Sequence, residues 1–147
     1  MIIGARFNGP PGSGNGGYSG TPLVRKLGIT EDANVLLDGA PAGFALDGVP
    51  PGAEIRTRLG PGPYDVIVCF CPDHARLSQR WPVLHSRTTS AGSLWIAWPK
   101  RASGRAIDLD DNVVREFALS HGRVDVKICA VDEVWSAMKH VIRKADR

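Results

Sequence analysis

The stretch DVIVCFC, from Asp65 to Cys71, is the most apolar run of the chain and decides the fold class. A short continuous apolar run bounded by turn residues is typical of a strand covered on both faces, as in parallel sheets. Gly60-Pro61-Gly62-Pro63 breaks the chain before it, and Pro72-Asp73 opens a predicted helix after it, through Leu84. The run therefore predicts a central strand of an α/β protein.

Strands and helices alternate on either side of this run. Helices are expected from Thr21-Pro22 to a stop at Gly28, briefly after the glycine-bearing turn 38–44, and from an N-cap at Asp108 to Ser120. A turn is expected at 90–92, and the other expected strands are 34–38, 53–59, 93–98, 124–131 and 136–142, of which the last also fits a helix. This alternation predicts a mainly parallel sheet of about six strands with right-handed crossovers and an antiparallel last strand.

Length and composition predict one domain at 21–147 behind a Gly/Pro-rich arm at 1–20. The chain has 147 residues, and 7 of the 17 residues from 4 to 20 are glycine. No apolar run is long enough to cross a bilayer and no secretory signal is recognised, so we expect a cytoplasmic protein that has no membrane contact.

Charge is uneven along the chain. Residues 1–73 carry 5 basic and 7 acidic side chains, a balance of −2, whereas residues 74–147 carry 13 and 8, a balance of +5. Such asymmetry fits a surface for a small anionic ligand. No basic stripe is interleaved with exposed aromatic residues in the sequence, so nucleic acid is not expected as a partner.

Three cysteines, Cys69, Cys71 and Cys129, lie in apolar strands. An odd number argues against a disulfide framework. Cys69 and Cys71 share one face of a strand, which would suit a metal, but no histidine stands at ligand spacing. We therefore interpret them as buried core thiols and expect no metal site.

The turn after strand 34–38 is the first candidate site, with Asp38, Gly39 and Gly43. A glycine loop between a strand and a helix lets the backbone approach a ligand, and the helix N-terminus favours anions. The alternative is a tight turn packed under the sheet.

Two loops at the far end of the chain give further candidates for ligand binding. Lys100, Arg101 and Ser103 follow strand 93–98 and could bind a phosphate or carboxylate, and Trp98 could stack on a ring. Asp132, Glu133 and Trp135 form the connection between the last two strands. Adjacent carboxylates on extended backbone point to opposite sides, so a structural role is the alternative for this second group.

The order of elements resembles the Rossmann-like methyltransferase fold, whose sheet ends in an antiparallel strand. VLLDGAPAGF at 35–44 matches that family's glycine loop, and SAGSLWIAWPK at 90–100 resembles its fifth-strand segment. The resemblance implies a three-layer fold with S-adenosylmethionine as a possible cofactor. One strand–helix unit is missing between Phe44 and Asp65, and Thr57-Arg58-Leu59-Gly60 lacks the acidic residue that would hold the ribose.

Three segments resemble a small bacterial family of unknown function with a degenerate form of that fold. They are PLVRKLG at 22–28, LWIAWPK at 94–100 with Ser103-Gly104, and CAVDEVWS at 129–136. This resemblance runs from Thr21 to the end and implies no activity. RFNGPPGSGNGGYSG at 6–20 resembles the opening of hot-dog thioesterase-like proteins that act on acyl-CoA.

These patterns favour a non-catalytic protein that binds a small anionic ligand or a partner in the crevice above strands 34–38 and 93–98. The alternative is an S-adenosylmethionine-dependent methyltransferase with divergent motifs. A third hypothesis is a structural module that forms a homodimer through an edge strand and the arm. No nucleophile elbow or P-loop occurs in the sequence.

Overall fold

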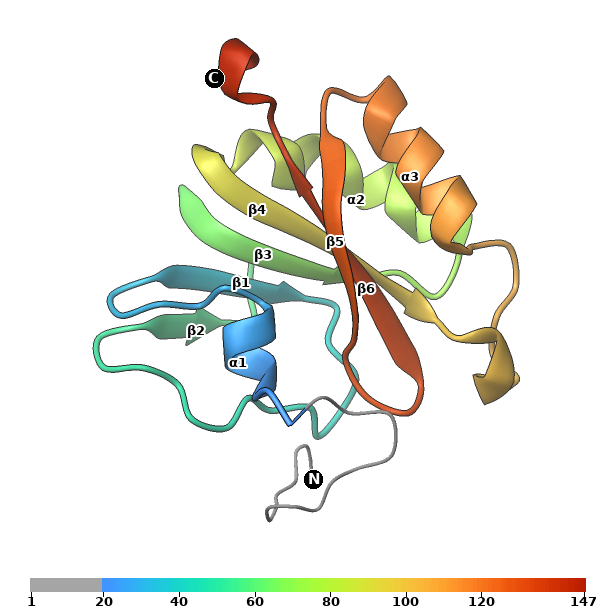
Figure 1. Cartoon of the computed structure of the whole chain (residues 1–147), viewed down its shortest axis with the longest axis horizontal. Helices are drawn as coiled ribbons and strands as arrows, with labels where there is room; N and C mark the ends of the chain where they lie inside the picture. The colour runs from blue at the N-terminus through green and yellow to red at the C-terminus, as the bar shows by residue number, and fades with distance from the viewer. Residues whose placement is uncertain (1–19) are drawn as a thin grey trace.

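A six-stranded sheet in the order β2-β1-β3-β4-β6-β5 organises the computed structural model, which describes residues 20–147 (Figure 1). Its first four strands in sequence are parallel, and β6 is antiparallel to both β4 and β5. The predicted mainly parallel sheet with an antiparallel last strand is confirmed. The strands are β1 (Asn34–Asp38), β2 (Glu54–Arg56), β3 (Tyr64–Phe70), β4 (Thr88–Pro99), β5 (Val124–Ala130) and β6 (Trp135–Val141).

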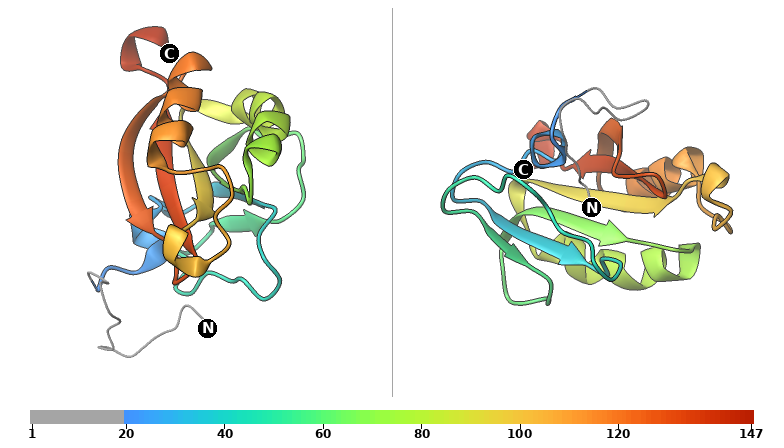
Figure 2. Two further views of the ribbon diagram at one scale, coloured as in Figure 1. Left: turned by 90° about the vertical axis from the view of Figure 1, so that its right-hand side faces the viewer. Right: turned by 90° about the horizontal axis from the view of Figure 1, so that it is seen from below.

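Helices lie on both faces of the sheet. Helices α2 (His74–Ser86) and α3 (Asp111–Ser120) pack on one face, while α1 (Leu23–Lys26) and the connection 39–53 cover the other (Figure 2). Two short 3-10 helices, η1 (Arg101–Ser103) and η2 (Lys144–Asp146), follow β4 and β6. Among residues 20–147, no helix has the length and apolar character that a membrane crossing requires.

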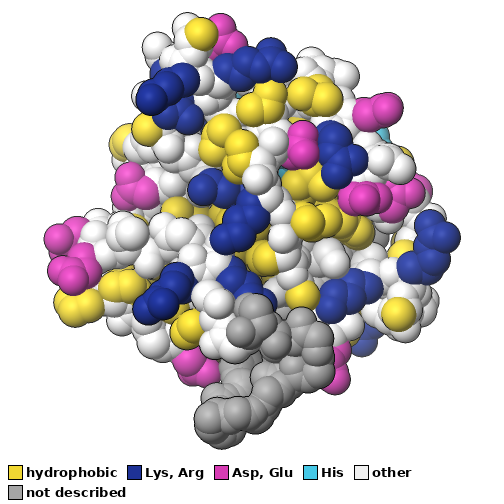
Figure 3. Space-filling model, viewed as in Figure 1, with side chains coloured by type: hydrophobic (Ala, Val, Ile, Leu, Met, Phe, Trp, Pro, Cys, Tyr) yellow, Lys and Arg dark blue, Asp and Glu magenta, His cyan; other side chains and the backbone are white. Residues whose placement is uncertain are grey.

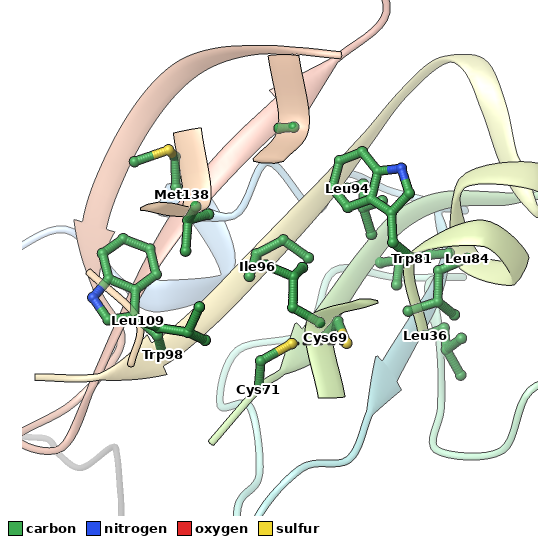
Figure 4. Packing of buried hydrophobic residues seen from close by; sticks show 14 of the residues in the cluster. Leu36, Cys69, Cys71, Trp81, Leu84, Leu94, Ile96, Trp98, Leu109 and Met138 are labelled. Carbon is green, nitrogen blue, oxygen red and sulfur yellow. Dashed lines mark hydrogen bonds between the residues drawn. The ribbon is translucent and has the colours of Figure 1, made fainter. Parts of the chain in front are cut away.

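Alternation along the central strands divides the core into two clusters. Ile67 and Cys69 of β3, with Ile96 and Trp98 of β4, face α2 and α3 (Figure 4). Their neighbours in the chain, including Phe70 and Trp95, face α1. Since successive side chains of a strand point to opposite faces, a run buried on both faces must be apolar throughout, which explains the composition of DVIVCFC.

The connections on either side of β2 pass over opposite faces. Phe44 and Leu46 of connection 39–53 pack in the α1-side cluster, whereas Leu59, after β2, packs in the α2-side cluster. β2 and β3 lie on opposite sides of β1, so the chain moves in one direction from β1 to β2 and in the other from β2 to β3. Because these two connections also pass over opposite faces of the sheet, the β1–β2 and β2–β3 crossovers have the same hand as β3–α2–β4. The brief helix expected after Asp38 is wrong: only a turn forms, in which Phe44 N donates to Pro41 O at 3.0 Å.

Strand β4 is longer than predicted, and the turn expected at 90–92 is wrong. Gly92 lies inside β4, where a Cβ would come within 2.8 Å of Asp65 O. The pairing of β3 with β4 shifts register between Tyr64 and Val66. Glycine is therefore used here for a close approach of two strands and not for chain reversal.

Helix ends also differ from expectation. Asp110 caps α3, since its Oδ1 accepts from Val113 N at 2.9 Å, and Asp108 instead accepts from His74 N of α2 at 2.7 Å. Pro22 precedes α1 as its N-cap, in place of Thr21. Strand β2 is confined to Glu54–Arg56, whereas β6 is a strand as predicted. The arm and its thioesterase-like segment lie outside the described residues, apart from Gly20.

Candidate functional site

The carboxyl ends of β1 and β3 lie side by side, because the two strands pair in parallel with Asp38 opposite Cys69. The chain leaves β1 toward β2 on one side and leaves β3 toward β4 on the other. Ligands of open α/β sheets bind in the crevice where the strand order reverses in this way. The ends of β1 and β3, bordered by the first turns of α2, are therefore the candidate site, which we call the crevice. The crevice expected above strands 34–38 and 93–98 is wrong, because β3 lies between these two strands.

Asp38 ends β1 with a buried carboxylate that Arg80 of α2 holds through two bonds. Arg80 Nε donates to Oδ2 at 3.0 Å and Nη2 donates to Oδ1 at 2.8 Å. The hydrogen bonds to Asp38 raise the pKa of Arg80, so this guanidinium stays charged. Asp38, which the sequence suggested for cofactor binding, is therefore engaged by a helix of its own chain.

Two thiols lie beside this ion pair. Cys69 Sγ is 3.4 Å from Asp38 Oδ2 and 3.5 Å from Cys71 Sγ. The hydrogen bond with Cys71 and burial raise the pKa of Cys69 far above its ordinary value. Since the thiolate is the nucleophile and the metal ligand, Cys69 is inert at neutral pH. Cys69 and Cys71 are buried as predicted, and Cys129 is half-buried.

Arg76 is the cation that faces the glycine turn. A Cβ on Gly39 would lie 3.0 Å from Arg76 Nη2 and 3.3 Å from Phe70 O, so the turn, the helix and the end of β3 meet here. Gly39 also has a φ of 74°, which disfavours any side chain. Arg76 Nε is buried and has no partner among the described residues.

A hollow of about 450 Å³ opens beside Arg76, lined by Pro72, Asp73, Ala75, Arg76 and Gln79. Asp73 caps α2, because its carboxylate accepts from Arg76 N at 2.9 Å. Asp108 accepts from the N–H of His74, the first residue of α2. These carboxylates offset much of the positive end of the helix. The hollow therefore combines one guanidinium with hydrogen-bond acceptors and two apolar walls.

Arg76 and Arg80 are not among the residues predicted from the sequence, although their spacing of four residues is a signal that could have indicated them. Residues four apart on a helix lie on the same face. A helix that follows a central strand at the switch point therefore brings both guanidinium groups over the strand ends. The sequence does not state that β1 lies next to β3, and only this strand order shows that the face of α2 with Arg76 and Arg80 meets Gly39 and Asp38.

Gly43 lies farther along the same turn and has a different role. Its φ is 82°, and no atom of the described residues lies within 4 Å of a Cβ placed there. The following residue, Phe44, packs edge-to-face on Phe70 at 5.1 Å, and Phe70 packs in the same way on Trp135 at 5.2 Å. This row of three aromatic rings covers the turn on the α1 face of the sheet. Of the two glycines, Gly39 is the one that closely approaches Arg76 and Phe70.

The predicted ligand-binding residues of the loops after β4 and β5 lie close together, but most of their polar groups bond to main-chain groups of the same two loops. Lys100 Nζ donates to Asp132 O at 2.6 Å, and Ser103 Oγ donates to Lys100 O at 2.6 Å. Asp132 Oδ1 accepts from the N–H groups of Val134 and Trp135, both at 2.8 Å. The loops after β4 and β5 are thereby tied to each other.

The aromatic residues of this group are core residues. Trp98 is 5% exposed and lies near Leu109 and Met138 (Figure 4), and Trp135 is buried on the opposite face. Arg101 and Glu133 are exposed, so they are the members of the group that present charged side chains to solvent. The β4–β6 pairing, with Pro99 opposite Trp135, holds the two loops next to each other.

A second polar cluster surrounds Trp81 at the junction of α2, α3 and the β5–β6 pair. His85, His121 and His140 have ring centroids 6.0, 6.3 and 5.9 Å from that of Trp81, and Phe117 packs on it at 5.5 Å. Trp81 Nε1 and His140 Nε2 are buried without a partner among residues 20–147.

Arg123 anchors this cluster from the start of β5. Its guanidinium donates to His85 Nδ1 at 2.9 Å and to His140 O at 3.4 Å, while Nη2 has no partner in the described part of the chain. Burial lowers the pKa of Arg123 to about 10 and that of His140 to about 4. A hollow of about 270 Å³ beside this cluster is lined by His74, Phe117 and His121 among others but not by Arg123.

Comparison with known proteins adds no identification, since no protein-family model and no curated protein matches the chain. In the described residues, no three side chains of histidine, cysteine, aspartate or glutamate come together in a way that could hold a metal ion.

Proposed function

We propose that this protein is a non-catalytic binding protein that takes a small anionic ligand at the carboxyl ends of β1 and β3. The observation that carries the proposal is the Arg76 guanidinium, which lies against Gly39 beside the 450 Å³ hollow and whose buried Nε has no partner in the described part of the chain. A planar guanidinium suits a carboxylate or phosphate. Gln79 and Asp73 line the same hollow and offer acceptors for hydroxyl or amino groups of the ligand.

The proposal that the protein is not a catalyst is supported by the contacts of the groups around the crevice that could act as a base or a nucleophile. Asp38 is held by Arg80, and the raised pKa of Cys69 keeps its thiol protonated. A catalytic base must be free to accept a proton from the substrate. Binding without turnover is the role that these contacts support best.

We further propose that the sheet is a three-layer, Rossmann-like domain related to methyltransferases and to the small bacterial family named above. Support comes from the crossover on each side of β1 and from the antiparallel β6. S-adenosylmethionine is the alternative ligand, and the close approach at Gly39 favours it. Against it, β2 ends at Arg56 and is followed by Thr57 and Arg58, so no carboxylate follows this strand for a ribose.

A thermal-shift panel tests the proposal, using S-adenosylmethionine, its demethylated product, nucleotides, acyl-CoA, phosphate and small dicarboxylates. We expect at least one anion to raise the melting temperature of the wild type, and R76Q to remove most of that rise. The matched control R58Q removes the same charge from an exposed loop position and should leave the shift unchanged.

The outcomes separate the hypotheses. A shift from S-adenosylmethionine and its product alone would favour the methyltransferase alternative. A shift that survives R76Q would place the ligand elsewhere, and no shift from any compound would remove the small-ligand proposal. Amide chemical-shift changes at Gly39 and residues 73–79 on titration would locate the ligand directly.

A further inference from the structure

Strand β5 forms an edge of the sheet, because among residues 20–147 it pairs with β6 and with no other strand. An edge strand presents unpaired N–H and C=O groups to solvent. The middle of β5 is also exposed, with Val126 and Ile128 at 53% and 51% accessibility. These are two of the five large hydrophobic residues that are exposed among residues 20–147.

The two faces of this edge differ in chemistry. Ile128 pairs with Met138, whose side chain belongs to the cluster under α2 and α3, so Ile128 lies on that face. Lys127 pairs with Lys139 and lies on the α1 face, where its Nζ donates to Lys26 O at 3.3 Å. The edge is therefore basic on one face and apolar on the other.

Positive charge is concentrated on the α1 face of the β5–β6 pair. Like charges directly opposite each other on neighbouring strands are destabilising, and Lys127 and Lys139 are such a pair. The ammonium groups of Lys26, Lys127 and Lys100 all act electrostatically on the Cys129 thiol, which places them around one point of β5. Figure 3 shows Lys and Arg side chains near the centre of this face, beside exposed hydrophobic ones.

Carboxylates of the described residues do not neutralise the Lys127–Lys139 pair. The three ion pairs found among residues 20–147 are made by Arg56, Arg80 and Arg115. An edge strand with two uncompensated lysines side by side is complementary to a negatively charged partner.

We propose that the edge of β5 is a docking surface for an acidic, extended peptide segment that adds a strand to the sheet. Carboxylates of the segment on the α1 face would meet Lys127 directly and lie in the positive field of Lys139 one strand farther in, and the intervening apolar side chains would meet Ile128. Main-chain hydrogen bonds supply affinity in this mode of recognition, and the alternate side chains supply specificity. The site is separate from the crevice at Arg76.

Charge argues against a second copy of the chain as the occupant. Antiparallel pairing of two β5 strands centred on Lys127 would oppose two lysines. Pairing centred on Val126 would oppose Asp125 and Lys127, but the register shift between these residues puts them on different faces, with Asp125 bound to Arg115 of α3. Beyond the shift, Lys127 to Ala130 pair regularly with β6 and offer a straight edge.

Nucleic acid is a weaker match for the same charge. Proteins that bind single strands stack bases on exposed aromatic side chains. The large hydrophobic residues exposed in the described chain are valines, leucine and isoleucines, with no aromatic residue among them. A peptide with alternating acidic and apolar residues fits both faces of the edge.

Calorimetric titration with a synthetic peptide of alternating Glu and Val tests the inference. We expect saturable binding that weakens at least tenfold in K127E/K139E, while R58E, a single charge reversal in a remote exposed loop, leaves affinity unchanged. A Lys–Val peptide should bind K127E/K139E and not the wild type. This charge exchange is informative even if the double variant is less stable, because gained binding requires a folded surface.

Two further probes determine the mode and the class of partner. Two further peptides carry N-methyl groups at every second residue, one at the odd positions and one at the even positions. At least one of them should lose affinity, because methylation removes the N–H donors along one edge of the peptide. Equal binding of all peptides would overturn strand addition. Binding of a DNA oligonucleotide but not of the Glu–Val peptide would assign the surface to nucleic acid, and absence of binding by every probe would overturn the inference.

Discussion

Arg123 Nε donates a hydrogen bond to His85 Nδ1 at 2.9 Å, and the arginine that makes this bond is 1% exposed. His85 accepts this bond only while Nδ1 carries no proton. Burial, Arg123 and His121 together lower the pKa of His85 below its ordinary value. The link between the last turn of α2 and the start of β5 therefore depends on a neutral histidine.

The first prediction is a loss of stability as pH falls from about 6.5 to 4. His140 has a pKa of about 4 in the folded protein, mainly through burial, against 6.5 for an unperturbed histidine. Asp125 raises this pKa, whereas Arg123 and Arg115 lower it. Because the folded state binds fewer protons, stability is fully present above pH 6.5 and falls by about 3 kcal/mol toward pH 4. Urea unfolding across this range measures it.

The variant H140Q serves as the control for this pH dependence. Glutamine does not titrate, so the free energy of unfolding should depend less steeply on pH between 6.5 and 4.5, where most carboxylates remain ionised. Equal slopes for wild type and H140Q would show that other groups carry the effect.

The second prediction concerns the charge of Arg123. R123M keeps much of the buried volume and removes a guanidinium whose Nη2 has no described partner, so we expect it to cost about 1 kcal/mol or less. R123A leaves a cavity and should cost about 3 kcal/mol. In R123M the pKa of His85 should rise part of the way to its ordinary value, because one nearby cation is gone. NMR titration of the His85 ring measures this, and an unchanged pKa would contradict it.

The third prediction concerns the ion pair beneath the crevice. D38N leaves the Arg80 guanidinium without its charged partner in a mostly buried position, so we expect a loss of about 2 kcal/mol. A double-mutant cycle with R80Q measures the coupling between the two side chains, which should be favourable. Additive effects of D38N and R80Q would mean that the pair contributes nothing specific.

The fourth prediction uses Gly39 and Gly43 as a matched pair. Both have positive φ, so alanine costs about 1 kcal/mol of backbone strain at each. At Gly39 the Cβ also meets Arg76 Nη2 and Phe70 O, whereas at Gly43 it meets no atom of residues 20–147. G39A should therefore be the more destabilising variant in thermal unfolding and should also displace Arg76. Equal losses would show that the close approach is not maintained in solution.

Sequence patterns predicted the central strands well, because burial on both faces demands continuous apolar runs such as 65–71. They failed at Gly92 and Asp108, where the residue type fits two local roles and only a neighbouring element decides between them. Gly92 suits a turn, but Asp65 of the adjacent strand makes it a close-contact residue. Asp108 suits a cap for α3, but the first turn of α2 lies within its reach.

The candidate site was predicted only in part, because the crevice was expected above strands 34–38 and 93–98 and β3 lies between these two strands. A glycine turn after an apolar strand located Gly39 correctly at the strand ends, because that edge follows from parallel alternation. Arg76 and Arg80 could not be placed in the site from the sequence, because the sequence does not state which strand lies next to β3 and hence which residues their helix faces. Lys100 and Asp132 were proposed as ligand-binding residues on the chemistry of their side chains. In the structure, Lys100 donates to a main-chain carbonyl of the neighbouring loop, and the Asp132 carboxylate accepts from main-chain N–H groups of its own loop.

The unequal covering of the two sheet faces implies that one side of the molecule opens more easily than the other. One face is sealed by α2 and α3, whose amides are protected by helical hydrogen bonds, and the other by a single turn of helix and the irregular connection 39–53. Segments of the second kind detach in local unfolding events that cost less than global unfolding. Hydrogen exchange should accordingly divide this single sheet into a slow side and a fast side, with the aromatic row of Phe44, Phe70 and Trp135 exposed transiently to solvent from the fast one.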